Sequence, residues 1–287
     1  MPGPFTERTP RVAAARRLTR RAGRDAAGEF LAEGPQAVRE ALAGALAGTV
    51  PPPRELFATA DALARHRDLV DLAGSAGVPV SEVTPHAAEA LSETTTPQGL
   101  VAVCPALDVL LAVALAGRPC LVAVLADVRD PGNAGTVLRS ADAAGADAVV
   151  LAGDSVDPYN GKAVRASAGS LFHLPVVRGA DLAAALDAAH RAGLTVLAAD
   201  GAGEADLDAL DDDGTLAAPT AWLFGNEAWG LPAAVGALAD RRVRIPIHDR
   251  AESLNLAAAA AVCLFGSARA RRRPAGSGAD RRDRAMP

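Results

Sequence analysis

Short apolar runs alternate with helical stretches from residue 119 onward, and this rhythm limits the fold more than any other feature of the chain. Strands are predicted at residues 120–126, 148–151, 174–177, 195–199, 221–224 and 243–247. Helices are predicted between or after them at 134–144, 182–192, 232–238 and 254–268. The strands are apolar on both faces, which is typical of a parallel sheet covered by helices on either side. We therefore expect an α/β domain over residues 119–268.

A smaller α/β unit is predicted over residues 28–104. Its first stretch, FLAEGPQAVREALAGALAG, has apolar spacing that suits a helix. Apolar runs at 55–59, 78–83 and 100–104 then alternate with Ala-rich helical stretches such as 61–73. An Ala/Leu-rich linker is predicted over 105–118, so the chain is expected to hold two domains.

The two ends of the chain are basic, although the formal net charge is −5. Residues 1–30 hold seven arginines against three acidic residues, and residues 265–287 hold seven arginines against two. We expect basic tails over 1–27 and 269–287, with the second disordered. Basic ends on an acidic body suit contacts with nucleic-acid phosphates, which give affinity without sequence information. Solvated ends that only improve solubility are the alternative.

The cysteine and histidine patterns argue against disulfides and bound metal. The three cysteines at 104, 120 and 263 are widely spaced and form no CxxC pair, which fits a reducing cytosol. The five histidines show no ligand spacing, so no metal is expected. The first residues lack the apolar core of a signal peptide, and charged, Gly and Pro residues break the most apolar stretch. A cytoplasmic protein without a membrane segment is therefore expected.

Ligands of an open parallel sheet bind where strands end, and three segments with polar and glycine residues lie at such ends. The first segment covers residues 127–140. A proline and two glycines, the second of them Gly135, are expected to shape a tight turn there. Asn133 is expected to cap the following helix and to leave Arg139 on its second turn. A plain helix cap and a surface ion pair are the alternatives for these two side chains.

The second segment covers residues 223–232, where Gly225 and Gly230 would let the backbone approach a ligand closely. Asn226 and Glu227 offer polar groups between them, and an ordinary strand-to-helix loop is the alternative. The third segment covers residues 245–256. Its polar side chains, Ser253 and Asn255, are candidates for the same site or mere helix caps.

Together the three segments resemble the three signature motifs of the SpoU/TrmH family of RNA 2′-O-methyltransferases, which belong to the SPOUT class. Asn133, Gly135 and Arg139 match the pattern Asn-x-Gly-x-x-x-Arg. Residues 225–231 match Gly-Asn-Glu-x-x-Gly-Leu, and residues 253–255 match Ser-Leu-Asn. The stretch 165–175 also looks like the segment that the family has between its first two motifs. The resemblance covers about 119–268, and residues 28–104 loosely resemble the family's ribosomal-protein-like substrate-binding domain.

The resemblance implies a fold, a methyl donor and a substrate. The C-terminal domain is expected to be a parallel-sheet SPOUT domain whose chain passes through a loop to form a deep trefoil knot. The expected cofactor is S-adenosylmethionine, whose methyl group is transferred to a ribose 2′-hydroxyl of structured RNA. The layout favours 23S ribosomal RNA and leaves transfer RNA open. The resemblance also implies a homodimer with active sites completed across the interface.

The resemblance also implies roles for individual residues. The expected catalytic set is Arg139, Asn133, Glu227, Ser253 and Asn255. The expected methyl-donor contacts are Gly201, Leu223, Phe224, Gly225, Asn226, Gly230, Ile245, Ile247, Ser253 and Leu254. The expected contacts with the RNA backbone are Lys162, Arg165 and Ser170, with solvated charges as the alternative for the first two. A guanidinium rarely loses its proton, so Arg139 is expected to clamp a phosphate and stabilise developing negative charge.

Two other functions fit parts of the sequence. A nucleotide-dependent oxidoreductase would use the glycines at 201 and 203, but Asp206 occupies the third glycine position of GxGxxG. A non-catalytic RNA-binding or ribosome-assembly protein could keep the same fold. The joint presence of Asn133, Arg139, Glu227 and Ser253 argues against it, because a protein without catalysis has no physical need for all four.

Overall fold

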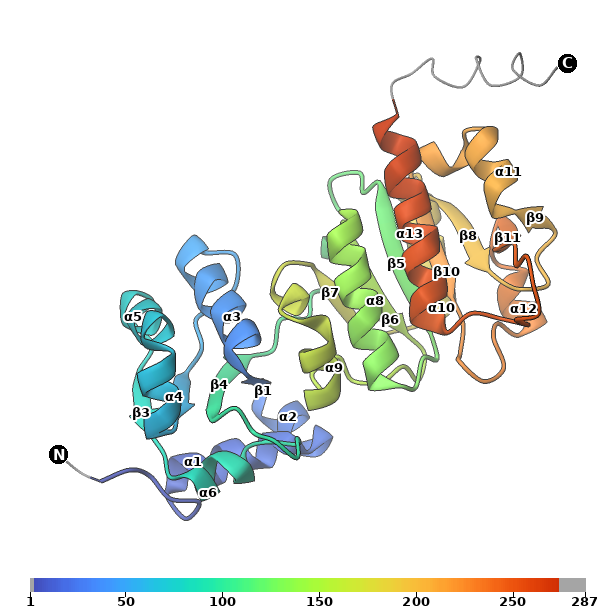
Figure 1. Cartoon of the computed structure of the whole chain (residues 1–287). Coiled ribbons are helices and arrows are strands. Elements are labelled where there is room, and N and C mark those ends of the chain that lie inside the picture. The colour runs from blue at the N-terminus through green and yellow to red at the C-terminus, as the bar shows by residue number, and fades with distance from the viewer. Residues whose placement is uncertain (1–2, 274–287) are drawn as a thin grey trace, which may run out of the picture. The chain divides into compact units, whose positions relative to one another are not determined.

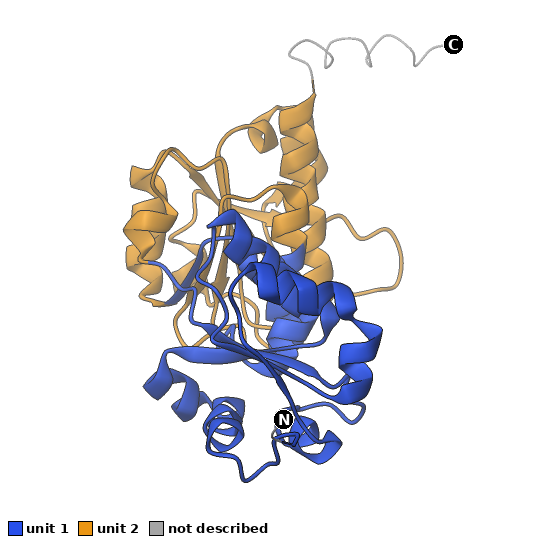
Figure 2. Cartoon of the chain, turned by 90° about the vertical axis from the view of Figure 1, so that its left-hand side faces the viewer, with its two compact units in different colours: residues 1–109, 129–139, 156–178 blue, residues 110–128, 140–155, 179–287 orange. Residues whose placement is uncertain are grey.

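The computed structural model describes residues 3–273, and the chain divides into two compact units (Figure 2). Unit 1 comprises residues 1–109, 129–139 and 156–178. Unit 2 comprises residues 110–128, 140–155 and 179–287. Two pieces of the predicted 119–268 domain therefore cluster with the N-terminal part of the chain. No helix within residues 3–273 combines the length and the apolar character needed to cross a lipid bilayer.

Unit 1 is built on a four-stranded sheet with the order β1-β4-β2-β3. The strands are β1 (Glu29–Glu33), β2 (Glu55–Ala58), β3 (Val80–Glu82) and β4 (Leu100–Pro105). β4 pairs antiparallel with both β1 and β2, while β3 pairs parallel with β2. The helices between them are α3 (Pro35–Ala47), α4 (Ala60–Arg65), α5 (Arg67–Ser75) and α6 (Pro85–Ala90). The three apolar runs predicted in this region are thus strands.

The stretch that begins at Phe30 was expected to be helical throughout, and this is wrong for its first residues. Glu29–Glu33 form β1, in which Phe30 and Ala32 are fully buried. Gly34 follows with a φ of 90°, a backbone conformation that strongly favours glycine. Pro35 then occupies the first turn of α3, where its missing N–H costs nothing. The glycine and proline, rather than the apolar spacing, set the boundary.

Residues 1–27 were expected to be a basic tail, but most of them are folded. They form α1 (Pro10–Arg16), a 3₁₀ turn η1 (Arg17–Thr19) and α2 (Arg21–Ala27). Val12, Ala15 and Leu18 recur every three residues and pack into the core of unit 1. Of the tail expected at 269–287, Arg269–Arg272 continue the last helix, and residues 274–287 lie outside the described part of the chain.

The second sheet has seven strands in the order β7-β6-β5-β10-β8-β11-β9. They are β5 (Leu121–Ala126), β6 (Ala148–Ala152), β7 (Val176–Ala180), β8 (Thr195–Ala199), β9 (Ala205–Asp206), β10 (Thr220–Phe224) and β11 (Arg241–Arg244). The pairs from β6 through β9 are parallel. The prediction of an α/β fold with a parallel sheet is confirmed. β9 was not predicted, and β11 ends at Arg244, opposite the last residue of β9, rather than at the predicted residue 247.

The four helices predicted in the C-terminal half are present, and the described residues also form three short helices there that were not predicted (Figure 1). They are α7 (Leu111–Ala114), α8 (Pro131–Ala144), α9 (Gly161–Ser167), α10 (Leu182–Arg191), α11 (Leu207–Asp212), α12 (Ala233–Gly236) and α13 (Leu256–Arg272), with 3₁₀ turns η2 (Ser170–Phe172) and η3 (Thr215–Ala217). α13 packs against β5, β8 and β10. The indole N–H of Trp222 on β10 donates to Ser267 Oγ on α13 at 2.9 Å, and both residues are fully buried.

The order of strands reverses at the centre of the second sheet, where β10 lies between β5 and β8. Phe224 at the end of β10 is in register with Leu125 of β5 and Ala199 of β8. The chain segments that follow these three strands therefore leave from the same edge. Such a switch point is where ligands bind in open α/β sheets. The trefoil knot expected in this region stays a prediction.

Candidate active site

A cavity of about 650 Å³ lies at this edge of the second sheet, within unit 2. Its size falls within the range of small-molecule sites, about 300–1,000 Å³. Residues after β8, β10 and β11 and the start of α13 line it. The predicted donor contacts that line it are Gly201, Phe224, Gly225, Asn226, Gly230, Ile245, Ile247, Ser253 and Leu254. Leu223 is the one predicted donor contact that does not line it, and its side chain is fully buried.

The loop after β10 closes on itself and presents its backbone to the cavity. Asn226 N donates to Gly230 O at 3.0 Å, and Gly230 N donates to Asn226 O at 2.9 Å. Gly230 has a φ of 66°. A Cβ on Gly225 would lie 2.5 Å from the carbonyl carbon and oxygen of Gly230, a separation that real side chains do not reach. The closed loop therefore requires glycine at position 225.

Asn226 joins the second segment to the first. Its side chain is almost completely buried, and Nδ2 donates to the backbone carbonyl oxygen of Asp127 at 2.7 Å. Its Oδ1 accepts from Ala228 N at 2.8 Å. The amide thus uses both ends to hold the loop over the end of β5. Through these contacts Asn226 positions the backbone that lines the cavity.

Asp127 is itself held in an unusual conformation at the end of β5. Its φ is 54°, which is uncommon for a residue other than glycine. Its Oδ1 accepts from Asp154 N at 2.8 Å, beyond the end of β6. The next residue, Val128, donates its N–H to Ser155 Oγ at 3.1 Å. Our sequence reasoning assigned no role to Asp127 or Ser155, although an aspartate directly after a buried strand is a detectable signal.

The start of α8 differs from the prediction. The helix begins at Pro131, and Asp130 caps it, because Asp130 Oδ1 accepts from Asn133 N at 2.8 Å. Asn133 is therefore in the first turn rather than at the cap, and Arg139 is in the third turn rather than the second. The Arg139 side chain is exposed and forms no ion pair with any residue in the 3–273 range.

Gly135 does not shape a turn, because it lies inside α8. A Cβ at this position would lie 2.3 Å from the carbonyl oxygen of Ala163 and 2.7 Å from the Cβ of Ala166, both on α9. The glycine thus lets α8 and α9 approach at backbone distance. Its place in the first motif has a packing reason that the sequence pattern did not reveal.

The residues expected to contact RNA differ in exposure. Lys162 is exposed, and its Nζ lies 2.7 Å from Asp130 Oδ2. This hydrogen bond from Lys162 holds the pKa of the Asp130 carboxyl below its usual value. Arg165 Nη1 lies 3.0 Å from Glu33 Oε2 and is partly buried. Ser170 is buried in η2, so a direct contact between its hydroxyl and an RNA backbone is not supported by this structure.

The third segment borders the cavity and then starts α13. Ser253 and Leu254 line the cavity, and both are exposed. The side chain of Asn255 accepts from Ala257 N at 2.9 Å, so Asn255 is the helix cap that was one of its two expected roles. It does not line the cavity, whereas Glu227 of the second segment does.

Charged side chains that sequence reasoning missed also line the cavity. Asp200 follows β8, and its Oδ2 lies 3.5 Å from Arg242 Nη1. Asp206 and Arg244 form a pair with a 3.2 Å separation between Oδ2 and Nη2. A cavity with both charge signs and apolar walls suits a ligand that carries an ammonium, a carboxylate and an aromatic ring. Across residues 3–273, no three His, Cys, Asp or Glu side chains group so that they could hold a metal ion.

Comparison with known proteins places this site in a family. A sequence model described as the SpoU rRNA Methylase family matches residues 120–265. A model described as the MRM3-like substrate binding domain matches residues 9–102.

Two relatives of known activity match the chain. It is 36% identical over 189 residues to the 23S rRNA (guanosine(2553)-2′-O)-methyltransferase RlmP of Bacillus subtilis, covering 66% of this chain and 72% of that one. It is 44% identical over 144 residues to the 23S rRNA (uridine(2479)-2′-O)-methyltransferase of Streptomyces viridochromogenes, covering 49% of this chain and half of the relative.

Two solved structures resemble nearly the whole chain. The AdoMet-bound rRNA methyltransferase from Sinorhizobium meliloti has a TM-score of 0.78 at 31% identity, with 93% of this chain and 97% of that chain covered. The SpoU methyltransferase AviRb from Streptomyces viridochromogenes, in complex with AdoMet, has a TM-score of 0.75 at 32% identity, with 92% and 99% covered.

Proposed function

Because the chain belongs to the SpoU rRNA methylase family, we propose that it transfers a methyl group from S-adenosylmethionine to a ribose 2′-hydroxyl of 23S ribosomal RNA. The observation that carries this proposal is the cavity that the second and third segments line together at the carboxyl ends of β8, β10 and β11. The relatives named above methylate ribose hydroxyls of 23S rRNA, and the similarity to solved structures extends over both units.

The cavity suits S-adenosylmethionine in size and chemistry. Ile245, Ile247 and Leu254 offer apolar surface for the adenine ring. The backbone of the closed loop 225–230 lines the cavity and brings peptide groups next to a bound ligand. The charged Asp200 and Arg244 suit the amino and carboxylate groups. When bound, this cofactor supplies an electrophilic methyl group on a sulfonium.

The chain's own residues then have to place and activate the ribose hydroxyl. Arg139 is the residue to which we assign the activation. A guanidinium rarely loses its proton in proteins, so we assign Arg139 to binding the phosphate beside the target ribose and to stabilising negative charge that develops on the 2′-oxygen. Its exposure and the absence of an ion pair within the described range leave it available for an anion. Asn133, Glu227 and Ser253 are assigned to orienting the reactants.

A homodimer is part of the same proposal. Unit 2 exposes large apolar side chains on α13 and on the loops that line the cavity, namely Val262, Phe265, Leu254, Ile247 and Trp229. Val262 and Phe265 are three residues apart and so lie on one face of α13. Covering this surface by a second copy would remove it from water. Light scattering on the purified chain would show twice the monomer mass, and a monomer at micromolar concentration would contradict it.

The test of the function is transfer of a radiolabelled methyl group from S-adenosylmethionine to a 23S rRNA transcript. Primer-extension stops at low nucleotide concentration would map the 2′-O-methyl group. We expect one modified nucleotide and no label in a transcript that carries a 2′-deoxyribose there. Label found only in transfer RNA would show that transfer RNA, and not 23S rRNA, is the substrate. RNA binding without any label would contradict the enzymatic assignment.

A further inference from the structure

An arginine-rich turn lies at the surface of unit 1 where α1 leads into α2. We call residues 16–21 the arginine turn; its four arginines, Arg16, Arg17, Arg20 and Arg21, are all exposed. Arg21 forms an exposed i,i+4 pair with Asp25 at 3.6 Å. The other three have no acidic partner within 4.0 Å anywhere in residues 3–273. Three of the four positive charges of the turn therefore have no acidic side chain beside them within the described residues.

The backbone of the arginine turn is held in place by contacts with the rest of unit 1. Leu18 is buried in the core of unit 1, so the middle of the turn is anchored. Gly23 on α2 comes so close to the turn that a Cβ there would lie 2.0 Å from the carbonyl oxygen of Arg17. Arg20 N also donates to that oxygen, at 3.1 Å. The four exposed side chains thus project from a fixed backbone.

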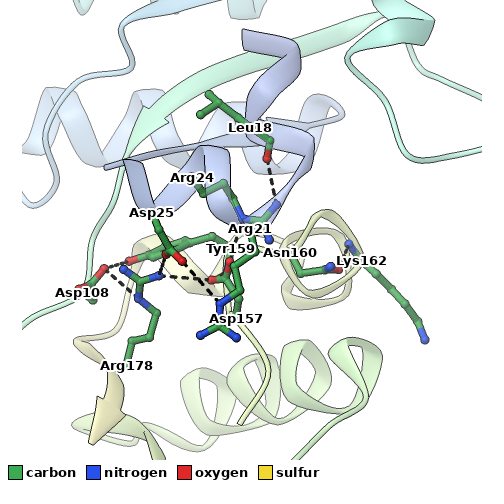
Figure 3. Close-up of polar contacts among 10 residues, drawn as sticks. All are labelled: Leu18, Arg21, Arg24, Asp25, Asp108, Asp157, Tyr159, Asn160, Lys162 and Arg178. Atoms are coloured by element: carbon green, nitrogen blue, oxygen red, sulfur yellow. Dashed lines mark hydrogen bonds and ion pairs between the residues drawn. The ribbon is translucent and has the colours of Figure 1, made fainter. Parts of the chain in front are cut away.

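A fifth arginine, Arg24, points inward and locks the turn (Figure 3). Its Nη1 donates to the carbonyl oxygen of Leu18 at 2.9 Å, and its Nε lies 2.8 Å from Asp157 Oδ2. The Arg24 and Asp157 side chains are only 4% and 3% exposed. Burying an ion pair costs desolvation free energy, so it is a poor way to gain stability alone. We therefore attribute this ion pair to holding the arginine turn in one defined conformation.

The same ion pair connects the arginine turn to the segment of unit 1 that carries Lys162. Asp157 begins the segment that leads through Asn160 to Lys162 (Figure 3). Asp157 Oδ1 accepts from Tyr159 N at 3.0 Å, and Asn160 Oδ1 accepts from Lys162 N at 2.9 Å. The arginine turn and the segment that carries Lys162, far apart in the sequence, are therefore held together by hydrogen bonds.

We propose that the arginine turn binds the sugar–phosphate backbone of the RNA substrate, without reading its sequence. This inference rests on the proposed function, because it assigns part of the surface that the RNA occupies. Guanidinium groups bind phosphate through paired hydrogen bonds, and RNA presents phosphates at short regular intervals that match several neighbouring arginines. The sequence model of the substrate binding domain begins at residue 9 and so includes the turn.

The test compares two double variants of equal charge. Arg17→Gln/Arg20→Gln removes two charges from the arginine turn. Arg65→Gln/Arg67→Gln removes two from α4 and α5 of the same unit, where both arginines are exposed and also lack an acidic partner in the described range. Binding to a 23S rRNA transcript is measured by filter retention over a series of salt concentrations. Calorimetry with S-adenosylmethionine and thermal unfolding are measured alongside.

We expect the turn variant to bind the transcript at least about tenfold more weakly, the loss expected for one or two charge-assisted hydrogen bonds. The slope of log affinity against log salt should fall by about two, roughly one for each phosphate that is no longer bound. The α4/α5 variant should stay within about twofold of the wild type. Arg17→Lys/Arg20→Lys should keep most of the salt slope, because it keeps the charge. Affinity for S-adenosylmethionine and the unfolding temperature should not change.

Equal weakening by both glutamine variants would overturn the inference, because it would reflect total charge alone. An unchanged salt slope in the turn variant would also overturn it while leaving the proposed function intact, provided the wild type methylates the transcript. A wild-type chain that binds no RNA would instead contradict the proposed function and this inference together.

Discussion

The side-chain nitrogen of Asn226 lies 2.7 Å from the backbone carbonyl oxygen of Asp127, a residue 99 positions earlier in the chain. This bond ties the loop that lines the cavity to the end of the neighbouring strand. Because Asn226 is nearly fully buried, the amide has no water to replace its partner. The amide of Asn226 therefore helps to set the shape of the cavity.

Asn226→Asp should destabilise the protein and weaken cofactor binding. The change replaces the donating Nδ2 with a carboxylate oxygen that faces a carbonyl oxygen, and we expect a loss of about 1–3 kcal/mol in the free energy of unfolding. Urea titration and calorimetry with S-adenosylmethionine measure the two effects. Asn160→Asp is the matched control for stability, because Asn160 uses only its oxygen as the cap of α9. Equal stability of the two variants would contradict the role given to Nδ2.

Gly225→Ala should deform the closed loop. The added methyl group would lie 2.5 Å from Gly230 backbone atoms and 2.8 Å from Leu231 Cγ, so the loop must move. We expect a cost of about 1–3 kcal/mol in unfolding free energy and at least about tenfold weaker binding of S-adenosylmethionine. Gly74→Ala, in α5 with no atom within 4 Å, should leave both unchanged or raise stability by up to about 1 kcal/mol. Wild-type cofactor affinity in Gly225→Ala would argue against binding at this loop.

Arg139→Lys should lower turnover more than binding. Lysine keeps the charge but lacks the planar pair of donors, so it should stabilise the developing oxyanion less well. We expect kcat to fall by a factor of about 10²–10³. Rates are measured at saturating S-adenosylmethionine over a range of RNA concentrations. The control is Arg191→Lys, an exposed arginine on α10 that pairs with Asp187. A raised KM for RNA with an unchanged kcat would remove the catalytic role and leave only phosphate binding.

The ionisation of Tyr159 should report on the fold of unit 1. Burial, and then the charge of Asp108, raise the pKa of its hydroxyl well above the usual value of about 10. The hydroxyl donates to Asp108 Oδ1 at 3.0 Å and accepts from Leu107 N at 2.6 Å. The folded state therefore favours the neutral hydroxyl, and this preference stabilises the protein. The stabilisation is fully present below a pH of about 10, the usual pKa of tyrosine, and is lost as the pH rises toward the higher pKa of the folded state.

The chain contains a single tyrosine, so tyrosinate absorbance during an alkaline titration reads this one group. We expect no signal while the protein stays folded near pH of about 10, and a signal that appears together with unfolding at higher pH. Tyr159→Phe removes the signal and serves as the blank. Reversible ionisation with an ordinary midpoint, while circular dichroism remains native, would contradict the described environment.

The strands of the second sheet could be predicted because they are buried on both faces. The predicted run at 195–199 coincides with β8, and those at 120–126 and 221–224 differ from β5 and β10 by one residue. Continuous apolar runs of this length have few other stable arrangements in a chain with helices on either side. The glycines of the second segment were also found from the sequence, because a strand end followed by glycine is a local signal.

The start of α8 could not be predicted in the same way. Glycine disfavours a helix interior, so local propensity placed the helix start after Gly132 and Asn133. The structure overrides this preference through the Asp130 cap and the close approach of α9 at Gly135. α9 begins 26 residues after Gly135, and no local pattern carries information about its approach. The bond between Asn226 and Asp127 is invisible to sequence reasoning for the same reason.

The folded N-terminus was missed because arginines obscured its apolar spacing. Val12, Ala15 and Leu18 mark one face of a helical segment, but the charge of residues 1–27 favoured a solvated tail. The burial of Arg24 depends on Asp157, which lies 133 residues later. A prediction from composition alone was therefore wrong for residues 1–27, because the fold of this segment depends on a distant partner.

The central position of β10 also bears on how the protein is made. The ribosome synthesises β5, β6 and β8 before residues 220–224, yet β10 must lie between β5 and β8. Those two strands expose unpaired backbone edges toward each other until β10 emerges, and pairing across such long sequence separations is slow. The nascent chain should therefore be most prone to aggregate just before residues 220–224 leave the exit tunnel.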